Sequence, residues 1–504
     1  AENMLLVMRP YQIAATERIL SKLEIANNYK TYGTIAGGGY IWHTTGSGKT
    51  LTSFKTAQIA SKLPYIDKVM GSEDEWDLPR LSDNDMLQRI AADFQTAADI
   101  FDQAGLMRRD PASGSGHLSA SDQDKPNGVT ALAMKGRALL YAASPLSNPG
   151  NDITRWEAAA EANWTALKSA LDYGYLLLAK EKYTDNFYGT KYTNEQLWAY
   201  TSGSTTNYNN DRVQAFVPYC FSNNAFSSGQ CPTQNFVDKF ETAGGWPLNT
   251  PEERAAATAA GQYNEQNPYT NRDPRFDFVV IYNQKPVQGY GNASIYVNED
   301  GSLPSGSLIQ KRSGSEDGVS ETFYYEQKRT GALSNKGVQN LLLTDPIIRL
   351  AEVYLNYAEA ANEAYGPDGL APGATMTALQ ALNTVRDRVG MPAVLDAYTT
   401  DKDTLRPRIK NERTVELCFE GYHYFCDIRR WKDAPAIHRT RLTGMRVTKL
   451  SAGATAQYPT GFRYERFELP SNRQIAWKND GMYYVQFQTS DLLKMKNYVP
   501  NEAW

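Results

Sequence analysis

Histidine and cysteine are scarce in this chain of 504 residues, which contains only four of each. So few histidines argue against a histidine-rich metal centre and against acid–base chemistry that relies on imidazole. No two of the cysteines have the CxxC spacing typical of a zinc site. We therefore expect a protein without a metal centre and without a bound cofactor.

Two further absences narrow the class of protein. No apolar run approaches the roughly 18 residues that a membrane-spanning helix needs. There is also no excess of one charge, because 52 basic residues stand against 56 acidic ones and the net charge is −4. This balance excludes a strongly basic nucleic-acid binder and a highly charged disordered chain, and we expect no nucleic-acid partner.

Aromatic residues, by contrast, are abundant: the chain contains 32 Tyr, 17 Phe and 9 Trp. Tyrosine and tryptophan combine an apolar ring face with a polar edge, and side chains of this kind favour an amphipathic binding surface. Together with the shortage of histidine, this composition indicates binding more than catalysis.

The four cysteines fall into two pairs along the chain. Cys220 and Cys231 flank a loop rich in Ser, Asn and Gly, and could form a disulfide in an oxidising compartment. Spacing alone cannot establish the geometry of a disulfide, so a bonded pair and two free thiols remain open alternatives. Cys418 and Cys426 lie in a segment with a helical pattern, and we expect both to be free and buried.

Apolar residues recur at helical spacing soon after residue 70. The pattern predicts helices over residues 82–104, 129–143 and 156–173. A long irregular stretch then follows over residues 174–345, rich in Asn, Gly, Ser, Thr and Tyr, with short strand candidates such as Phe276–Ile281. Long loop-rich segments in a compact protein are usually functional, so we expect the binding residues here.

Helices return after the irregular stretch. Asp345 is the expected N-cap of a helix that has Pro346 in its first turn and Gly366 at its end. Two more helices are predicted over residues 375–389 and 408–420. Small alanines at the expected helix contacts favour tetratricopeptide-like pairs. We therefore predict a mainly α fold, with tetratricopeptide-like helix pairs, a large loop-rich excursion and few short strands.

A strand-like stretch, a glycine-rich loop and a helix follow one another between residues 40 and 63. The loop contains Gly46, Gly48, Lys49 and Thr50. Backbone N–H groups in such a loop point at phosphates, the lysine adds a positive charge, and the threonine hydroxyl can bind Mg²⁺. The strict form of this phosphate-binding motif requires a glycine where His43 stands.

The segments around this loop, residues 8–15 and 40–52, resemble the motor subunit of type I restriction enzymes, and the resemblance runs from about residue 5 to 69. In that family the Arg-Pro-Tyr-Gln stretch lies near the adenine and the Gly-Ser-Gly-Lys-Thr loop holds the phosphates. A motor also needs an acidic box on a second strand and an arginine finger. The nearest acidic cluster, residues 73–77, follows no apolar strand. We therefore expect residues 1–69 to be an incomplete foreign segment whose phosphate loop does not function.

The rest of the chain, from about Asp77 to Trp504, resembles the SusD/RagB family of outer-membrane glycan-binding lipoproteins. The resemblance is implied by an Ala-rich helix ending in Ser-Pro-Leu, an Asn-Arg-Asp-Pro-Arg-Phe turn, two long helical motifs and the closing tail. These stretches are residues 128–146, 271–276, 346–360, 411–431 and 497–504.

The resemblance implies non-catalytic capture of an oligosaccharide at the outer membrane, on the cell surface. The glycan would then pass to a SusC-type TonB-dependent transporter. Family members carry an N-terminal signal and a cysteine for lipid attachment, whereas the first cysteine here is Cys220 and no signal is recognisable. We expect two domains, 1–69 and 70–504, joined near Val69–Met70 by natural rearrangement or by an assembly error. The alternative function is an ATP-dependent DNA translocase fragment of a type I restriction enzyme.

Sugar rings bind by stacking on Trp or Tyr, while neighbouring polar side chains contact the hydroxyl groups. In the loop-rich stretch the candidates for ligand binding are Tyr208, Asn210, Trp246, Tyr290 and Tyr296. Trp246 is the leading candidate because it stands between glycines and a proline, where a regular element cannot easily bury it. The alternative is that these aromatic residues fix long loops onto the helical body.

The helical motifs also contain many charged residues, whose two possible roles differ. A pair of glutamates could act as acid and base, as in glycosidases. Because these residues lie beside apolar ones on core-type helices, we expect them instead to pair as ions between packed helices, and we expect no enzymatic activity. The residues concerned are Arg349, Glu352, Glu412, Arg413, Glu416, Glu420, Arg429 and Arg430.

Overall fold

The structure is a computed structural model in which one compact unit extends from Thr50 to Trp504. The other unit, Ala1–Lys49, lies outside the described residues, and so does the whole phosphate loop, including Thr50. The described residues are 65–66, 77–108, 125–189, 192–201, 231–287, 290–310, 319–328, 333–334, 337–338, 344–485 and 497.

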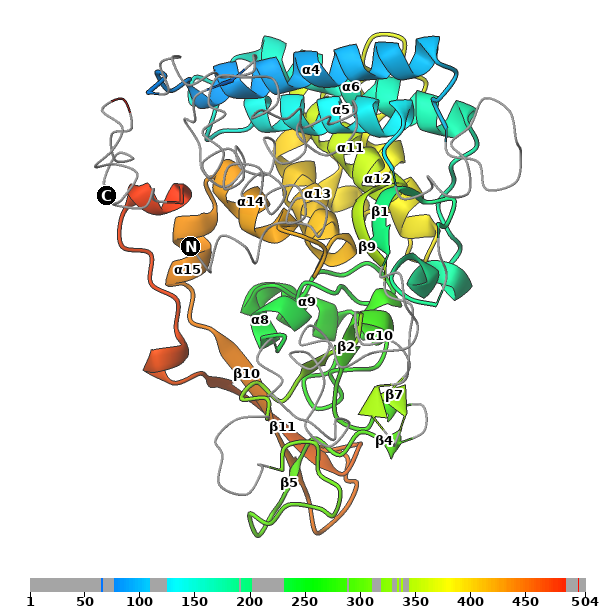
Figure 1. The fold of residues 1–504 in the computed structure, drawn as a ribbon. Helices are drawn as coiled ribbons and strands as arrows, with labels where there is room; N and C mark the ends of the chain where they lie inside the picture. Colours follow the sequence, from blue (N-terminus) through cyan, green and yellow to red (C-terminus); the bar gives the residue numbers. More distant parts are fainter. Residues whose placement is uncertain are drawn as a thin grey trace, which may run out of the picture. The chain divides into compact units, whose positions relative to one another are not determined.

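Helices packed side by side form the larger core. Helix α4 packs against α5, α5 against α6, α6 against α11, and α11 against both α12 and α13 (Figure 1). This succession confirms the mainly helical, paired arrangement predicted from the sequence. The bounds are α4 Asp83–Gln103, α5 Gly128–Ala143, α6 Ile153–Asp172, α11 Leu350–Tyr365, α12 Ala378–Asp387 and α13 Lys402–Glu416.

The first helices form where the apolar pattern predicts them. In α4 the side chains of Leu87, Ile90 and Phe94 are buried along one face, and Ser82 caps the helix by accepting a hydrogen bond from the Asp85 N–H. Helix α5 is buried on almost every side. Helix α6 approaches it closely at Gly136, where an added Cβ would lie 2.4 Å from an oxygen of α6.

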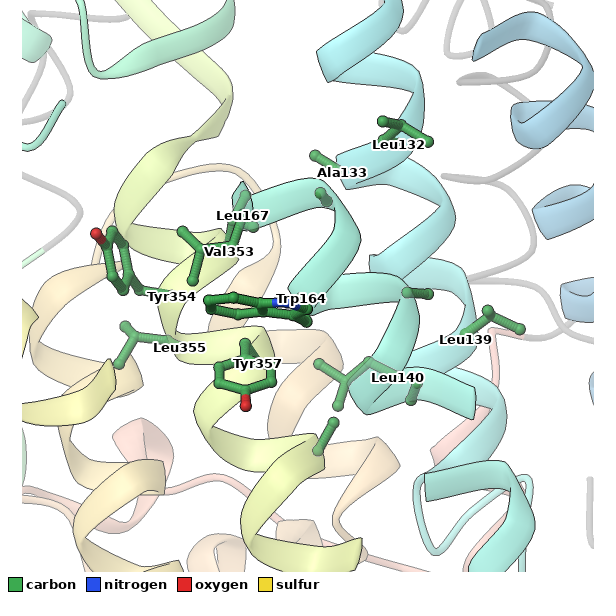
Figure 2. Packing of buried hydrophobic residues seen from close by; sticks show 14 of the residues in the cluster. Leu132, Ala133, Leu139, Leu140, Trp164, Leu167, Val353, Tyr354, Leu355 and Tyr357 are labelled. Atoms are coloured by element: carbon green, nitrogen blue, oxygen red, sulfur yellow. The ribbon is translucent and has the colours of Figure 1, made fainter. Parts of the chain in front are cut away.

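Trp164 of α6 and Tyr357 of α11 lie next to each other in this core, with ring centroids 5.3 Å apart (Figure 2). Their polar atoms are paired despite burial. The indole N–H of Trp164 donates to the Gly373 carbonyl at 2.9 Å, and the Tyr357 hydroxyl donates to the Met376 carbonyl at 2.6 Å. These bonds attach the loop after α11 to the helix pair.

The helix predicted from Pro346 begins four residues later than expected. Residues Thr344–Arg349 form strand β9, which pairs antiparallel with β1 (Gln196–Thr201), and α11 starts at Leu350. Asp345 is therefore a strand residue, and its predicted role as N-cap is wrong. The reason is tertiary, because β1 supplies strand partners that local sequence cannot reveal. Gly366 does end α11, with φ of +82°.

Helix α13 begins six residues before the predicted start, at Lys402, because Asp401 forms a capping box there. It ends at Glu416, before the predicted end at residue 420, and is followed by α14 (His423–Arg430) and α15 (Ala434–Arg439). Cys418 and Cys426 are free and buried, as predicted. Cys220 lies outside the described residues, so its pairing with the half-buried Cys231 stays a prediction.

The loop-rich excursion contains short elements around a second apolar cluster. The strand predicted over Phe276–Ile281 is wrong for its first four residues, which belong to α10 (Arg275–Val279). Only β2 (Val280–Ile281) is extended, and it pairs with β6 (Tyr325–Glu326). Further elements of the excursion are η2 Lys180–Asn186, α8 Gln234–Val237, α9 Pro251–Ala259, β3 Pro286–Val287, β4 Gly291–Asn292, β5 Val297–Asn298, β7 Leu333–Ser334 and β8 Gly337–Val338.

Two longer strands complete the second cluster. Strand β10 (Thr443–Lys449) pairs antiparallel with β11 (Phe462–Glu468) and parallel with β5. Short 3₁₀ turns follow at η5 (Ser471–Arg473) and η6 (Asp480–Tyr483), and another, η4 (Asp396–Tyr398), lies between α12 and α13. Among the described helices, none combines the length and apolar character needed to cross a bilayer.

Candidate functional site

Trp246 stands on a tight turn before α9. The Thr242 N–H donates to the Trp246 carbonyl at 2.9 Å, and the Gly245 N–H donates to the Thr242 carbonyl at 2.8 Å. Gly245 has φ of +79°, and an added Cβ there would lie 3.2 Å from Pro392. A side chain at this position would meet both backbone strain and the neighbouring loop, so glycine is required to present Trp246.

The ring of Trp246 is half-buried. One side packs against Leu248, Ala257 and Tyr263, which fixes the turn to α9. The indole N–H donates to no residue in the described part of the chain and remains open to solvent. Nearby, the buried Oδ1 of Asn249 also has no partner within that part. A fixed, partly open aromatic ring with a free indole N–H suits the apolar face and the hydroxyl groups of a sugar.

Among the other predicted binding residues, Tyr290 and Tyr296 pack in apolar clusters other than that of Trp246. Tyr290 is half-buried, and its hydroxyl donates to the Gly306 carbonyl. Tyr296 is only 8% exposed, and its ring packs edge-on against Phe462 at 5.1 Å, so it contributes to the second core and offers no open face. Tyr208 and Asn210 lie outside the described residues.

The sequence did not single out Tyr422 and Tyr424, which are 57% and 42% exposed at the start of α14. Both lie inside a motif whose other members are mostly buried, and the helical pattern hides their exposure. The reason is local backbone geometry: Phe419 and Gly421 have φ of +58° and +53°, which ends the preceding helix and turns the next residues outward.

A buried network of ion pairs connects the helical motifs, as the sequence predicts. Its centre is Arg349, whose Nη1 lies 2.7 Å from Glu195 and 2.6 Å from Glu416, while its Nη2 lies 2.7 Å from Glu420. The carboxylates are shared, because Arg388 also contacts both Glu195 and Glu416. Each of these buried charges thereby has an opposite charge beside it.

The remaining predicted charges have partners too, with one exception. Arg413 and Arg430 both contact Glu359 and Asp427, whereas Glu352 pairs with Arg137 and Glu412 with Arg275. Arg429 instead donates to backbone carbonyls. The sequence prediction missed further members: Arg137, Arg275 and Glu359, which lie within the motif stretches, and Glu195, Lys328, Arg386 and Arg388, which lie outside them.

The network keeps the carboxylates of Glu420 and Asp427 ionised. Burial by itself raises the pKa of a carboxyl group, but Arg349 and Lys328 hold the pKa of Glu420 at about 2. Arg413 and Arg430 likewise overcome burial and hold the pKa of Asp427 at about 2. A general acid must carry a proton near neutral pH. These two carboxylates therefore suit a structural role, and neither can serve as the acid of a glycosidase.

A small cavity lies between α4, α5, α14 and Tyr483–Tyr484, with a volume of about 40 Å³. One water needs roughly 10–15 Å³ in this measure, so about three waters fit. Ligand pockets for small organic molecules have volumes of about 300–1,000 Å³. This cavity cannot enclose a sugar ring, so a glycan would have to bind elsewhere, on an open face such as that of Trp246.

The predicted cofactor-binding residues all lie in the N-terminal segment. Gly46, Gly48, Lys49 and Thr50 lie outside the described residues, so their phosphate-binding role stays a prediction. Within the ranges that the structure describes, no three His, Cys, Asp or Glu side chains converge as metal ligands.

Comparison with known proteins separates the two parts of the chain. The model of the SusD family matches residues 194–504. A SusD-like protein from Bacteroides fragilis aligns with a TM-score of 0.64 and 24% identity, over 90% of this chain and 78% of that one. A SusD-like carbohydrate-binding protein from the same organism aligns with a TM-score of 0.62 and 20% identity, over 90% of this chain and 79% of that one. A laminarin-binding SusD-like protein aligns with a TM-score of 0.51 and 16% identity, over 92% of this chain and 78% of that one. At these identities the likeness shows the fold.

The N-terminal part is similar to restriction enzymes. The family model described as type III restriction enzyme, res subunit, matches residues 5–96. A putative type I restriction enzyme endonuclease subunit, C-terminal part, from Mycoplasma pneumoniae is 58% identical over 73 residues, which are 14% of this chain and 35% of that protein. A type I restriction enzyme endonuclease subunit from Staphylococcus saprophyticus is 47% identical over 78 residues, which are 15% of this chain and 7% of that protein. The chain thus spans about a third of the first relative and under a tenth of the second.

The restriction-enzyme match extends into α4, which structurally belongs to the helical body. Met86, Ile90 and Phe94 of this helix are buried in the main apolar cluster together with α5. The SusD family model covers more than half of the chain, and solved SusD-like proteins share the fold of the described residues. The chain therefore belongs to the SusD family and carries an N-terminal segment similar to type I restriction enzymes.

Proposed function

We propose that the chain binds an oligosaccharide without transforming it, at the outer-membrane surface. The family match over residues 194–504 carries this proposal. It is supported by the shared fold with a carbohydrate-binding and a laminarin-binding SusD-like protein. In the same proposal, a SusC-type TonB-dependent transporter receives the glycan for nutrient uptake.

Trp246 is the proposed stacking platform. Its ring is fixed by Leu248, Ala257 and Tyr263, so little side-chain freedom is lost when a sugar binds. Its indole N–H donates to no described residue, so a sugar hydroxyl can accept a hydrogen bond from it. Tyr290 and the unplaced Tyr208 and Asn210 remain proposed contributors.

Titration of the full chain with soluble polysaccharides tests the proposal. Stacking on an aromatic ring contributes about 1 kcal/mol, so Trp246→Ala should weaken binding about fivefold or more. Trp246→Phe should retain most of the affinity. Tyr173→Ala removes another partly exposed ring, at the end of α6, and should leave binding unchanged. Equal affinities for wild type and Trp246→Ala would remove Trp246 from the site.

The domain boundary is a second part of the proposal. We place the end of the foreign segment near residue 70, before α4 begins. Two contacts lie close to this boundary: the Tyr65 hydroxyl donates to Asp93 at 2.7 Å, and Arg89 lies 5.0 Å from the Tyr65 ring. Sequencing reads that span codons 60–90 in genomic DNA would distinguish a natural rearrangement from an assembly error.

An ATP-dependent DNA translocase fragment is the alternative function, and it is favoured by the 58% identity over 73 residues. The matched segment includes no second lobe from which an arginine finger could come. Phosphate release from ATP, measured with and without DNA, tests this alternative. Hydrolysis that Lys49→Ala abolishes would establish it, whereas the glycan-binding proposal expects none.

A further inference from the structure

Arg429 of α14 is a partly buried cation without a carboxylate partner. Its Nε donates to the Met482 carbonyl at 3.2 Å and its Nη1 to the Phe425 carbonyl at 3.1 Å. The guanidinium lies 3.4 Å from the centre of the Phe425 ring. Burial lowers the pKa of Arg429, and within the described ranges no ion pair offsets that burial. Its Nη2 group retains donors that no described residue accepts.

A second unused donor lies beside it. The Nε1 of Trp477 is buried and has no hydrogen-bond acceptor among the described residues. The Arg429 guanidinium lies 5.9 Å from the centre of the Trp477 ring, and His438 stacks on that ring with centroids 5.7 Å apart. Buried donors nearly always pair with a protein group, a water or a ligand. The Arg429 guanidinium and the Trp477 indole N–H together therefore favour a bound group that accepts hydrogen bonds.

Space for such an acceptor exists next to Arg429, which lines the cavity of about 40 Å³ described above. That volume takes about three waters, or a group of three or four heavy atoms, such as a carboxylate or the SO₃ end of a sulfate whose fourth oxygen stays outside. Tyr483 connects the two features, because it lines the cavity and packs edge-on against Trp477 at 4.8 Å. A sugar ring would stay outside while its charged substituent enters.

Asp83 of α4 lines the same cavity and limits where an anion can lie. Its carboxylate accepts a hydrogen bond from the Tyr484 hydroxyl at 2.8 Å. Like charges repel each other, so a bound anion must lie on the Arg429 side. Removing the charge of Asp83 should then strengthen anion binding, a result that a purely structural role of Arg429 does not predict.

We propose that Arg429, Trp477 and His438 form a binding site for an oxyanion carried by the glycan, a carboxylate or a sulfate. The guanidinium and the indole only donate hydrogen bonds, which matches a ligand group that only accepts them. Tyr422, the most exposed of the described aromatic side chains, lies seven residues before Arg429, about 10 Å along the helix, and offers a ring to a neighbouring sugar. This inference rests on the proposed function and makes its ligand an acidic glycan.

Calorimetric titration of the full chain with sodium sulfate, at constant ionic strength in sodium chloride, tests the anion site directly. We expect saturable binding that Arg429→Gln weakens tenfold or more, while Arg429→Lys keeps part of it. Trp477→Phe keeps the ring but removes the donor, and should weaken sulfate binding severalfold; Asp83→Asn should tighten it. Arg441→Gln, a matched change at an exposed ion pair, should have no effect. Absence of sulfate binding, or binding that ignores Arg429, would overturn the proposal.

A second titration compares charged glycans with neutral counterparts: polygalacturonate with its methyl ester, and dextran sulfate with dextran. At least one charged member should bind more tightly than its counterpart, and Arg429→Gln should remove the difference. If sulfate binds but charged and neutral glycans bind equally, the site takes a free oxyanion and its assignment to the glycan is overturned. If every glycan fails, the proposed function fails, and the sulfate titration still decides the anion site.

Discussion

Replacement of Arg349 by methionine would remove the cation at the centre of the buried network while filling a similar volume. Arg349 donates to both oxygens of Glu420 at 2.7 Å, to Glu195 at 2.7 Å, and to the side chain and backbone carbonyl of Glu416 at 2.6 and 2.7 Å. Without it, three carboxylates remain buried with fewer partners. Arg388 and Lys328 still compensate part of their charge.

Removing one partner from a buried ion pair costs about 3–5 kcal/mol. Since Arg388 and Lys328 remain, we expect the lower end of that range, about 3 kcal/mol. The entropy of unfolding is roughly 2.1 cal/mol/K per residue, or about 0.9 kcal/mol/K for the roughly 430 residues of the SusD-like part. The expected fall in Tm is therefore about 3 °C.

Thermal melting followed by near-ultraviolet circular dichroism measures this change. The matched control is Arg441→Met, because Arg441 pairs with Glu468 at 3.1 Å and both side chains are more than half exposed. Such surface pairs contribute at most about 1 kcal/mol, so the control should shift Tm by about 1 °C or less. A melting temperature of Arg349→Met at or above that of the wild type would refute the stabilising role of the network.

Three further predictions follow from the same structure. The fold lowers the pKa of Glu420 to about 2. Its stabilising contribution is therefore present above the unfolded pKa of about 4.3 and is lost as the pH falls towards 2. Urea unfolding midpoints measured from pH 7 to 2 should accordingly fall between about pH 4.3 and 2. Gly136→Ala places a methyl group against α6 and should destabilise the fold by about 1–3 kcal/mol in urea unfolding, whereas Gly150→Ala, which meets no atom within 4 Å, should be nearly neutral. Burial raises the pKa of the Cys418 and Cys426 thiols to about 12, so a disulfide reagent should modify them only after unfolding, and rapid labelling of the native protein would contradict their placement.

Helices with a clean apolar stripe and a capping residue could be predicted from the sequence, as the start of α4 at Ser82 shows. Such signals are local, because the cap and the stripe act within a few turns. The start of α11 could not be predicted in this way. Asp345 and Pro346 are residues typical of a helix start. They form a strand instead, because they pair with β1, which lies some 150 residues earlier in the chain.

For the candidate site, too, the sequence predicts what local signals determine and misses what contacts between distant segments determine. Trp246 stands where neighbouring glycine and proline prevent regular burial, and it does present a partly open ring. Tyr296 lies in the same loop-rich stretch, but Phe462 of β11 covers its ring, and no local pattern reports that contact. The charges of the helical motifs are predicted to form a network, whereas Glu195 is missed because it lies in a turn before β1, far from those motifs in the sequence.

The central claim is that this chain holds a glycan without cleaving it. Affinity gel electrophoresis of the full chain through a panel of soluble polysaccharides, combined with a reducing-end assay of the same mixtures, tests it most directly. We predict that at least one polysaccharide retards the protein, that Trp246→Ala reduces the retardation, and that no new reducing ends appear. Migration of the folded protein unaffected by every polysaccharide, or release of reducing ends, would contradict the account.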